Sequence, residues 1–368
     1  MRRPARTLAL LLALAGAAAA NACSIPVFRY ALERWPAAPY GAIVFHRGKL
    51  EPAARALLEQ LKGAASAQPA ANLECIEVDV EQPLPAELGE LWKSLNNPAL
   101  PFLVVRYPEG RRESAIAFSS PLNADALRGL LDSPARRELA KRLLGGESAV
   151  WLVLKSGSTA QDQAACKLLQ DELKGLAQEL KLPEQDPDGD AMARPAADLP
   201  LRLSFSILSL SREDAAERAF VQMLLGTDKD LAAEKGVLAF PVFGRGRLLC
   251  ALPEKQLTHE TIAEVAEFVT GACSCQVKDL NPGTDLLLAA DWEALLEGRA
   301  VEEPAPPLTG ITANRTAGVP RICGTPAQYA LAEQRSFQRQ LVIALGGLLF
   351  AVVVATVLLK RRAARKRN

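Results

Sequence analysis

Ala99-Leu100-Pro101-Phe102 recurs in the second half of the chain as Ala239-Phe240-Pro241-Val242. Each stretch opens an apolar strand, and each is followed by a charged turn that contains glycine, a return strand and a helix. Self-similarity of this kind is typical of a duplicated domain. The sequence therefore predicts two tandem copies of one domain, residues 40–148 and residues 149–300.

The same order of strands and helices surrounds the two prolines. Strands are recognised as apolar or alternating runs of residues, and helices as amphipathic runs with a period of about 3.6. Both copies follow the order β-α-β-α-β-β-α, which indicates an α/β fold with a partly parallel sheet closed by an antiparallel hairpin. The expected strands are Ala42–Phe45, Asn72–Val80, Pro101–Tyr107, Ser114–Phe118, Ala149–Leu154, Leu201–Leu208, one from Pro241, and Leu248–Leu252, and the expected helices are Glu51–Leu61, Pro85–Leu95, Asn123–Leu131, Ala160–Leu180, Glu213–Leu225 and His259–Val269.

This order resembles the thioredoxin fold, in which the proline that opens a strand is often cis and faces the active site. The resemblance covers residues 40–131 and 149–270, and it rests on the element order and on Pro101 and Pro241. It implies a mixed central sheet flanked by helices in each copy. It also implies cis peptide bonds before both prolines.

One departure from thioredoxin decides what the resemblance implies for function. A thioredoxin carries Cys-x-x-Cys just after its first strand, at the start of the next helix. The matching segments here are His46-Arg47-Gly48-Lys49-Leu50 and Lys155-Ser156-Gly157-Ser158-Thr159, and neither contains a cysteine. The attacking thiolate of dithiol exchange is therefore missing from both copies. The resemblance predicts the fold without oxidoreductase activity, with no catalytic residue and no cofactor.

The N-terminus carries the features of an export signal. Arg2, Arg3 and Arg6 precede the apolar run Leu8–Leu14, and Ala20-Asn21-Ala22 matches a small-residue cleavage site. This pattern predicts a secretory signal peptide at residues 1–22. The new N-terminus is then Cys23, and acylation of this cysteine is an alternative, although the Leu typical of a bacterial lipobox is missing three positions upstream.

The C-terminus carries the features of a membrane anchor. Leu341–Leu359 is apolar and uncharged, and the basic tail 360–368 follows it directly. A helix of roughly 20 apolar residues spans the hydrocarbon core of a bilayer. Basic residues favour the cytoplasmic side, so the bulk of the chain is expected to be extracytoplasmic and the C-terminus cytoplasmic. The sequence thus predicts a single-pass protein of the cell membrane whose first partner is the bilayer.

Three connecting segments complete the predicted organisation. Residues 23–39 form an N-terminal helical segment, residues 301–340 form a proline-rich, semi-rigid stalk, and residues 183–200 form an acidic insert in the second copy. The insert begins like a calcium loop but lacks the glycine and the glutamate that such a loop needs, so a solvated acidic loop is predicted. After the second copy, Asp285 is expected to cap a short helix.

Two further segments resemble parts of known proteins. CSIPVFRYALERW (residues 23–35) and GACSCQVKDLNPGTDLL (residues 271–287) are similar to segments of uncharacterised bacterial membrane-anchored proteins. This resemblance agrees with the export signal and the anchor and implies no particular activity.

Charge limits the class of partner. The whole chain has a formal net charge of +1, and much of its positive charge lies in the signal peptide and the tail. The part between them is mildly acidic and has no basic stripe, so nucleic acid is excluded as an expected partner.

The cysteines are the sharpest candidates for chemistry. The chain has seven, an odd number for a compartment in which disulfides form. Cys273 and Cys275 are one residue apart, so they can act as a redox pair or bind a soft metal, or each can form a structural disulfide elsewhere. A metal site needs further ligands, and the sequence does not supply an evident set. The candidate redox or disulfide residues are Cys23, Cys250, Cys273, Cys275 and Cys323.

The two histidines are weaker candidates. His46 follows the first strand, where the thioredoxin fold places its chemistry, but no nucleophile motif lies beside it. His259 lies in Thr258-His259-Glu260, a typical helix start. The sequence therefore predicts a redox-inactive interaction module, or an accessory subunit of a membrane complex, that binds another membrane or extracytoplasmic protein. The alternative is thiol or soft-metal handling at the cell surface through Cys273 and Cys275.

Overall fold

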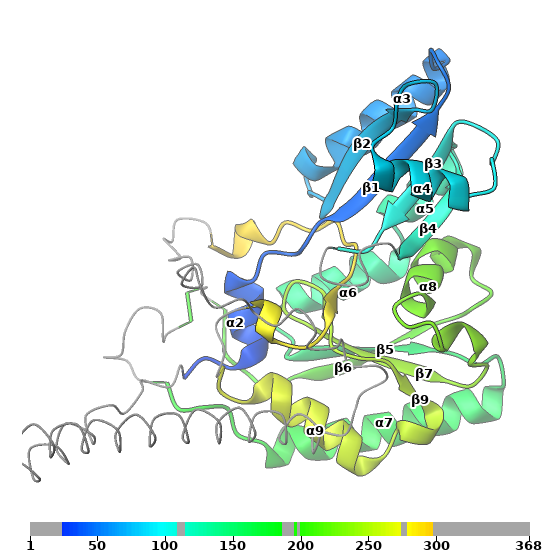
Figure 1. The fold of residues 1–368 in the computed structure, drawn as a ribbon. Coiled ribbons are helices and arrows are strands. Elements are labelled where there is room, and N and C mark those ends of the chain that lie inside the picture. The colour runs from blue at the N-terminus through cyan, green and yellow to red at the C-terminus, as the bar shows by residue number, and fades with distance from the viewer. Residues whose placement is uncertain (1–23, 109–114, 186–194, 197–198, 274–277, 297–368) are drawn as a thin grey trace, which may run out of the picture. The chain divides into compact units, whose positions relative to one another are not determined.

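The computed structural model describes the chain from residue 24 to residue 296 with four gaps, at 109–114, 186–194, 197–198 and 274–277 (Figure 1). The expected signal peptide, stalk and membrane helix lie outside the described residues, as do Cys23, Cys275 and Cys323. Within the described part, no helix is long and apolar enough to span a bilayer.

The first domain contains a four-stranded mixed sheet in the order β2-β1-β3-β4. β1 is parallel to β2 and antiparallel to β3, and β3 forms an antiparallel hairpin with β4. This is the predicted βαβ unit followed by a hairpin. Its strands are β1 (Tyr40–His46), β2 (Leu73–Asp79), β3 (Phe102–Arg106) and β4 (Ile116–Pro121), and its helices are α3 (Pro52–Gly63), α4 (Ala86–Ser94) and α5 (Ala124–Leu131).

The second domain repeats this arrangement in a six-stranded sheet. β5 is parallel to β6 and antiparallel to β7, which pairs with β8 and β9; β10 pairs with β8. The chain is therefore a mixed α/β protein with two mixed sheets, consistent with the thioredoxin-like order. The strands are β5 (Ala149–Leu154), β6 (Phe205–Leu210), β7 (Leu238–Phe243), β8 (Arg247–Leu248), β9 (Leu252–Pro253) and β10 (Thr284–Asp285), and the helices are α6 (Pro134–Leu144), α7 (Thr159–Glu179), α8 (Arg218–Leu225) and α9 (His259–Thr270).

The two prolines that align in sequence are not equivalent in the structure. The Leu100–Pro101 bond is cis, and β3 begins directly after it. Pro241 is instead the fourth residue of β7 and lies opposite Trp151, in the middle of β5. The bond before Pro241 is trans, contrary to expectation, because the strand already begins at Leu238 and its extended backbone continues through the proline.

The helix before the first sheet packs on the second domain. All eight residues of α2 (Val27–Arg34) are buried, against α9 and β7. Trp35, just after α2, makes an edge-to-face contact with Phe243, with 6.4 Å between ring centroids. At Gly244, where φ is +58°, an added Cβ would lie 2.6 Å from the Cβ of Ala31, so the close approach of α2 requires glycine there.

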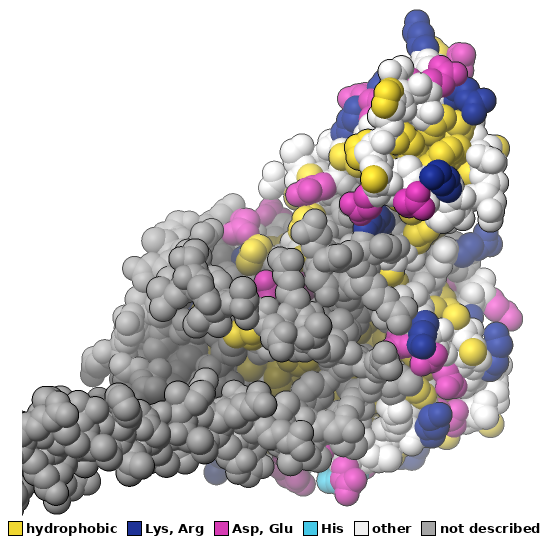
Figure 2. Space-filling view, in the orientation of Figure 1, with side chains coloured by type: hydrophobic (Ala, Val, Ile, Leu, Met, Phe, Trp, Pro, Cys, Tyr) yellow, Lys and Arg dark blue, Asp and Glu magenta, His cyan; other side chains and the backbone are white. Residues whose placement is uncertain are grey.

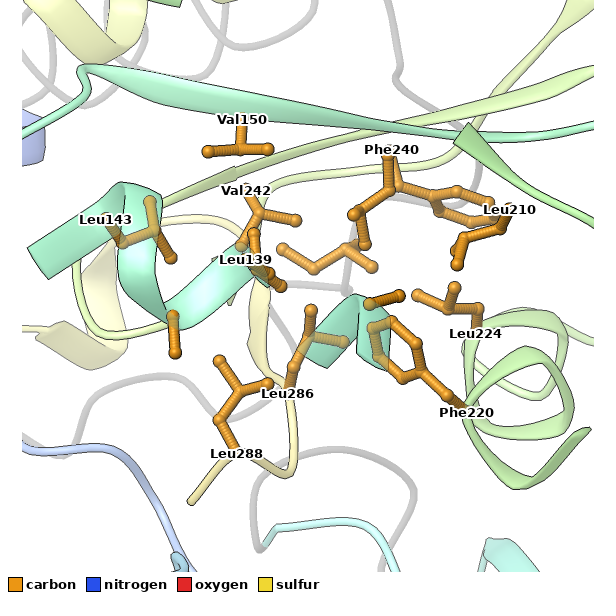
Figure 3. Packing of buried hydrophobic residues seen from close by; sticks show 14 of the residues in the cluster. Leu139, Leu143, Val150, Leu210, Phe220, Leu224, Phe240, Val242, Leu286 and Leu288 are labelled. Carbon is orange, nitrogen blue, oxygen red and sulfur yellow. The ribbon is translucent and has the colours of Figure 1, made fainter. Parts of the chain in front are cut away.

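The hydrophobic core of the second domain lies between its sheet and the pair α6 and α8. Leu139 and Leu143 of α6 face Val150 and Val242 of the sheet, as Figure 3 shows. The first domain has one core under α3 and α5 and a smaller cluster under α4. The core of the first domain also receives two side chains from α8 of the second domain, Ala219 and Met223.

Residues 284–292, which we call the strap, join the two domains. The expected helix capped by Asp285 is wrong: the strap begins as β10, and Ala289 forms an antiparallel bridge with Ala71 of the first domain. Leu287 enters the core of the first domain, while Leu286 and Leu288 enter that of the second. Alternation with period two is the signature of extended chain between two apolar surfaces, and a run of three leucines does not distinguish it from a helix.

Candidate functional site

The loop after β1 lies where the expected thioredoxin-like order would place an active site. Gly48 turns the chain with φ +56°, and the Asp79 carboxylate at the end of β2 accepts hydrogen bonds from the backbone N–H groups of Gly48 (3.1 Å) and Glu81 (3.0 Å). These bonds lower the pKa of Asp79, the one from Glu81 contributing most. The Gly48 N–H of this loop is therefore bonded within the domain.

His46 is enclosed at the end of β1 rather than presented to solvent. Its side chain is 7 % exposed, Nδ1–H donates to the Gly48 carbonyl (2.8 Å), and Nε2 lies 3.1 Å from Glu77 Oε1. Glu77 also accepts hydrogen bonds from Lys62 and Arg55, and the bond from Lys62 is the main cause of its lowered pKa. Both nitrogens of His46 thus face partners within the domain, an arrangement that holds the ring in place.

β2 also carries a thiol close in sequence to this cluster. Cys75 lies on β2, two residues before Glu77, and is partly buried. Burial raises the pKa of the Cys75 thiol to about 11, despite the opposing attraction of the Lys62 ammonium group. Because the thiolate is the nucleophile, this raised pKa disfavours Cys75 as a nucleophile at neutral pH.

The matching loop after β5 is closed in a similar way by a different residue. Asp162, in the first turn of α7, accepts hydrogen bonds from the Ser156 backbone N–H (2.7 Å), the Ser156 hydroxyl (2.8 Å) and the Gly157 N–H (3.3 Å). Burial alone would raise the pKa of Asp162, but these hydrogen bonds outweigh it and the pKa is lowered. Arg212 donates to the Lys155 carbonyl (3.1 Å) and so adds a further hydrogen bond to the loop.

Both loops therefore carry a carboxylate in place of thiols. In each, an aspartate of the same domain accepts hydrogen bonds from backbone N–H groups of the loop: Gly48 in the first domain, and Ser156 and Gly157 in the second. The sequence reasoning missed Asp79 and Asp162. Asp79 and Glu77 lie at alternate positions of one strand and hence on one face, and Asp162 is acidic in a first helical turn; these were the available signals.

The structure separates the candidate cysteines. Cys250 is disulfide-bonded and 5 % exposed, whereas Cys273 is a thiol and 2 % exposed. Cys166, which was not among the candidates, is a partly buried thiol with its Sγ 3.9 Å from Ser209 Oγ. Over the described ranges, no three His, Cys, Asp or Glu side chains are grouped as a metal site would require.

Comparison with known proteins adds little to this description. No family model matches the chain, and no curated protein matches it. Among solved structures it is similar to the first two thioredoxin domains of Eps1p from Naumovozyma dairenensis, with 14 % identity and a TM-score of 0.16, over 59 % of this chain and 84 % of that one. A TM-score this low carries no argument, so the thioredoxin-like class rests on strand order.

Proposed function

We propose that this protein is a membrane-tethered, extracytoplasmic interaction module, thioredoxin-like but without dithiol chemistry, that serves as an accessory subunit of a membrane complex. The observation that carries the proposal is the closure of both loops by Asp79 and Asp162, where a thioredoxin presents its thiols. A fold that keeps its shape and loses its nucleophiles retains binding surfaces as its means of action.

The cysteines support this proposal over the alternative of thiol or metal handling. A redox pair must be accessible and able to form a thiolate. Cys273 is buried, Cys250 is already bonded, and the pKa of Cys75 is about 11. These features favour structural roles for the cysteines of the described region.

The location is proposed from the two ends of the sequence. Export through residues 1–22 and anchoring through Leu341–Leu359 keep the two domains outside the cytoplasm and close to one bilayer. A tether raises the effective concentration of any partner in the same membrane, so that a weak contact becomes sufficient for association.

The test combines binding and chemistry on one sample. The full chain is extracted from its own membrane in mild detergent, its mass is measured by native mass spectrometry, and its reduction of a disulfide reporter is followed. We expect a stoichiometric complex with another membrane or extracytoplasmic protein, and no disulfide turnover above that of a Cys273→Ser/Cys275→Ser variant. A monomer that turns over the reporter would contradict the proposal.

A further inference from the structure

The two domains differ in how one face of the sheet is covered. In the second domain, the face that carries Val150, Leu152 and Leu154 is covered by two helices, α8 and α6. α6 contacts both β5 and β6. In the first domain, α4 takes the place of α8, but among the described residues no second helix covers this face. The helix expected there by position is α2, which precedes β1 as α6 precedes β5. α2 packs on the second domain instead.

The consequence is an incompletely buried apolar face. Ile43, Phe45, Val78 and Val104 form its buried centre. No residue of α4 itself is buried, and the hydrophobic side chains that it and the flanking loops place on this face remain partly exposed. Figure 1 shows β1 and β2 in view beside α4, and Figure 2 shows hydrophobic side chains gathered at the surface of the same domain.

Strand register identifies the matching residues. Phe45 pairs with Val78 as Leu154 pairs with Leu210, and each of these residues lies on the α4 or α8 face of its sheet. Ile76 lies two positions before Val78 on β2, and its counterpart Leu208 lies two positions before Leu210 on β6. Ile76 pairs with Ile43, and Leu208 pairs with Leu152. Leu208 packs against the core that contains α6, whereas Ile76 is 47 % exposed, the more open of the two exposed hydrophobic residues on this sheet.

A second pair of matching residues concerns charge. Arg142 of α6 donates to the Ser206 hydroxyl (3.1 Å) and to the Ile207 carbonyl (2.9 Å) on β6. By the same register, the counterpart of Ser206 in the first domain is Glu74, which is exposed. Arg142 of α6 lies over β6. An arginine in the same position over β2 would therefore contact the Glu74 carboxylate, which is a stronger acceptor for a guanidinium group than a hydroxyl or a carbonyl.

We propose that the open face of β1 and β2 beside α4 binds an amphipathic helix of a partner protein, with its apolar stripe on Ile76 and α4 and a basic residue opposite Glu74. The inference rests on the proposed function and names the surface and the class of partner. A helix is favoured over a strand because α6 shows which element this face accepts in the second domain. Binding completes the first domain as α6 completes the second.

The probe is a labelled peptide with the sequence of α6, Ser133–Gly146, added to the full chain in detergent and followed by fluorescence anisotropy. We expect saturable binding in the micromolar range. Ile76→Asp and Glu74→Lys should each weaken it at least about tenfold, since one complete charge pair or apolar anchor contributes about that factor. Leu168→Asp is the matched control, because Leu168 is 39 % exposed on α7 of the second domain, and it should leave binding unchanged.

Reversing both charges, Arg142 in the peptide and Glu74 in the chain, distinguishes a lost contact from a variant that has failed to fold. A peptide with Arg142→Glu should bind the unaltered chain more weakly and bind the Glu74→Lys chain more tightly than the unaltered peptide does. Absence of this rescue, absence of saturable binding, or binding unaffected by Ile76→Asp would each overturn the inference. Retention of a stoichiometric partner in that case would leave the proposed function standing.

Two other occupants have distinct signatures. The first alternative is that other residues of the same chain cover the face. In that case the thiol of an Ile76→Cys/Cys75→Ser variant will react slowly with a maleimide, even when the protein is monomeric and no peptide is added. If a second copy covers it, sedimentation will show a dimer that Ile76→Asp converts to monomer. Either result would overturn assignment to a partner helix.

Discussion

At the scale of single residues, two aspartates bond the backbone of the loops in which the resemblance to thioredoxin places its thiols. Asp162 lies at a helix start with three donors around it, and Asp79 lies at a strand end with two. Both arrangements bind the negative charge within the domain. These hydrogen bonds help to fix the shape of the loops and engage the N–H groups of Gly48, Ser156 and Gly157 within the domains.

Asp162→Asn tests this role. The variant loses hydrogen bonds to an ionised acceptor, so its free energy of unfolding at pH 7 should fall by about 1–3 kcal/mol. The pKa of Asp162 is lowered in the folded state, so its contribution is present above the unfolded value near 4 and is lost as the pH falls through the folded value. The difference between the two proteins should therefore shrink below pH 4 in chemical denaturation.

The control for this substitution is Asp171→Asn, on the exposed face of the same helix, where Asp171 forms an exposed ion pair with Lys167. Exposed pairs of this kind contribute less than about 1 kcal/mol. Equal stability of Asp162→Asn and the unaltered chain at pH 7 would show that the carboxylate does not hold the loop.

At the scale of elements, the strap and the residue that fastens it explain how two similar domains become one unit. Asn72 donates to the carbonyls of Ala38 (2.9 Å) and Leu286 (3.1 Å), and its Oδ1 accepts from the Leu288 N–H (2.9 Å). Nearby, the Tyr40 hydroxyl donates to the Asp285 carbonyl (2.9 Å). One amide side chain thus satisfies backbone groups of both the linker before β1 and the strap.

Asn72→Ala removes three hydrogen bonds at once. At about 1 kcal/mol each, and more where a partner stays buried, the free energy of unfolding should fall by about 3–5 kcal/mol. Gln68→Ala is the control: it removes one exposed bond between the same two regions, from Gln68 to Asp291 (2.9 Å), and should change stability by less than about 1 kcal/mol. Similar losses in the two variants, measured by urea denaturation, would show that Asn72 is not a special fastening point.

Sequence patterns predicted the elements better than their partners. Asn123 and Thr258 begin helices with side-chain caps, as their residue types favour, and Ala149–Leu154 forms a strand within the bounds expected from its apolar run. Local patterns suffice there because each element is defined by its own residues. The loop carboxylates and the fastening by Asn72 depend on chain segments far apart in sequence, so no local period reveals them.

The two larger errors have the same origin. Pro241 matches Pro101 in sequence, yet it falls inside a strand because the strand's start is set by pairing with β5. The sequence predicts a helix from Asp285, yet this segment runs as the extended strap because Ala289 pairs with Ala71 and the leucines of the strap enter two different cores. Contacts between segments far apart in the sequence determine both structures, and an alignment of the two repeats does not reveal such contacts.

At the scale of the whole molecule, the described domains share elements in both directions. The first domain supplies α2 to the second, and α8 of the second supplies Ala219 and Met223 to the core of the first. The Tyr107 hydroxyl donates to the Met223 carbonyl (2.5 Å), so the shared core is also joined by a hydrogen bond. The strap adds Leu287 to the first core while its neighbours enter the second. Such exchange leaves neither sheet with a complete core of its own.

Cooperative unfolding follows from this exchange. In native-state hydrogen exchange, the slowest amides of β1 and β5 should open with the same free energy, because opening either domain exposes core residues that belong to the other. Leu287→Ala truncates a side chain that lies only in the first core and should lower both free energies by about 2–5 kcal/mol. If it lowers protection in β1 alone, the domains are independent modules. The face of β1 and β2 beside α4 would then unfold independently of the second domain, whereas in a cooperative pair its exposure depends on the same contacts that keep α2 on the second domain.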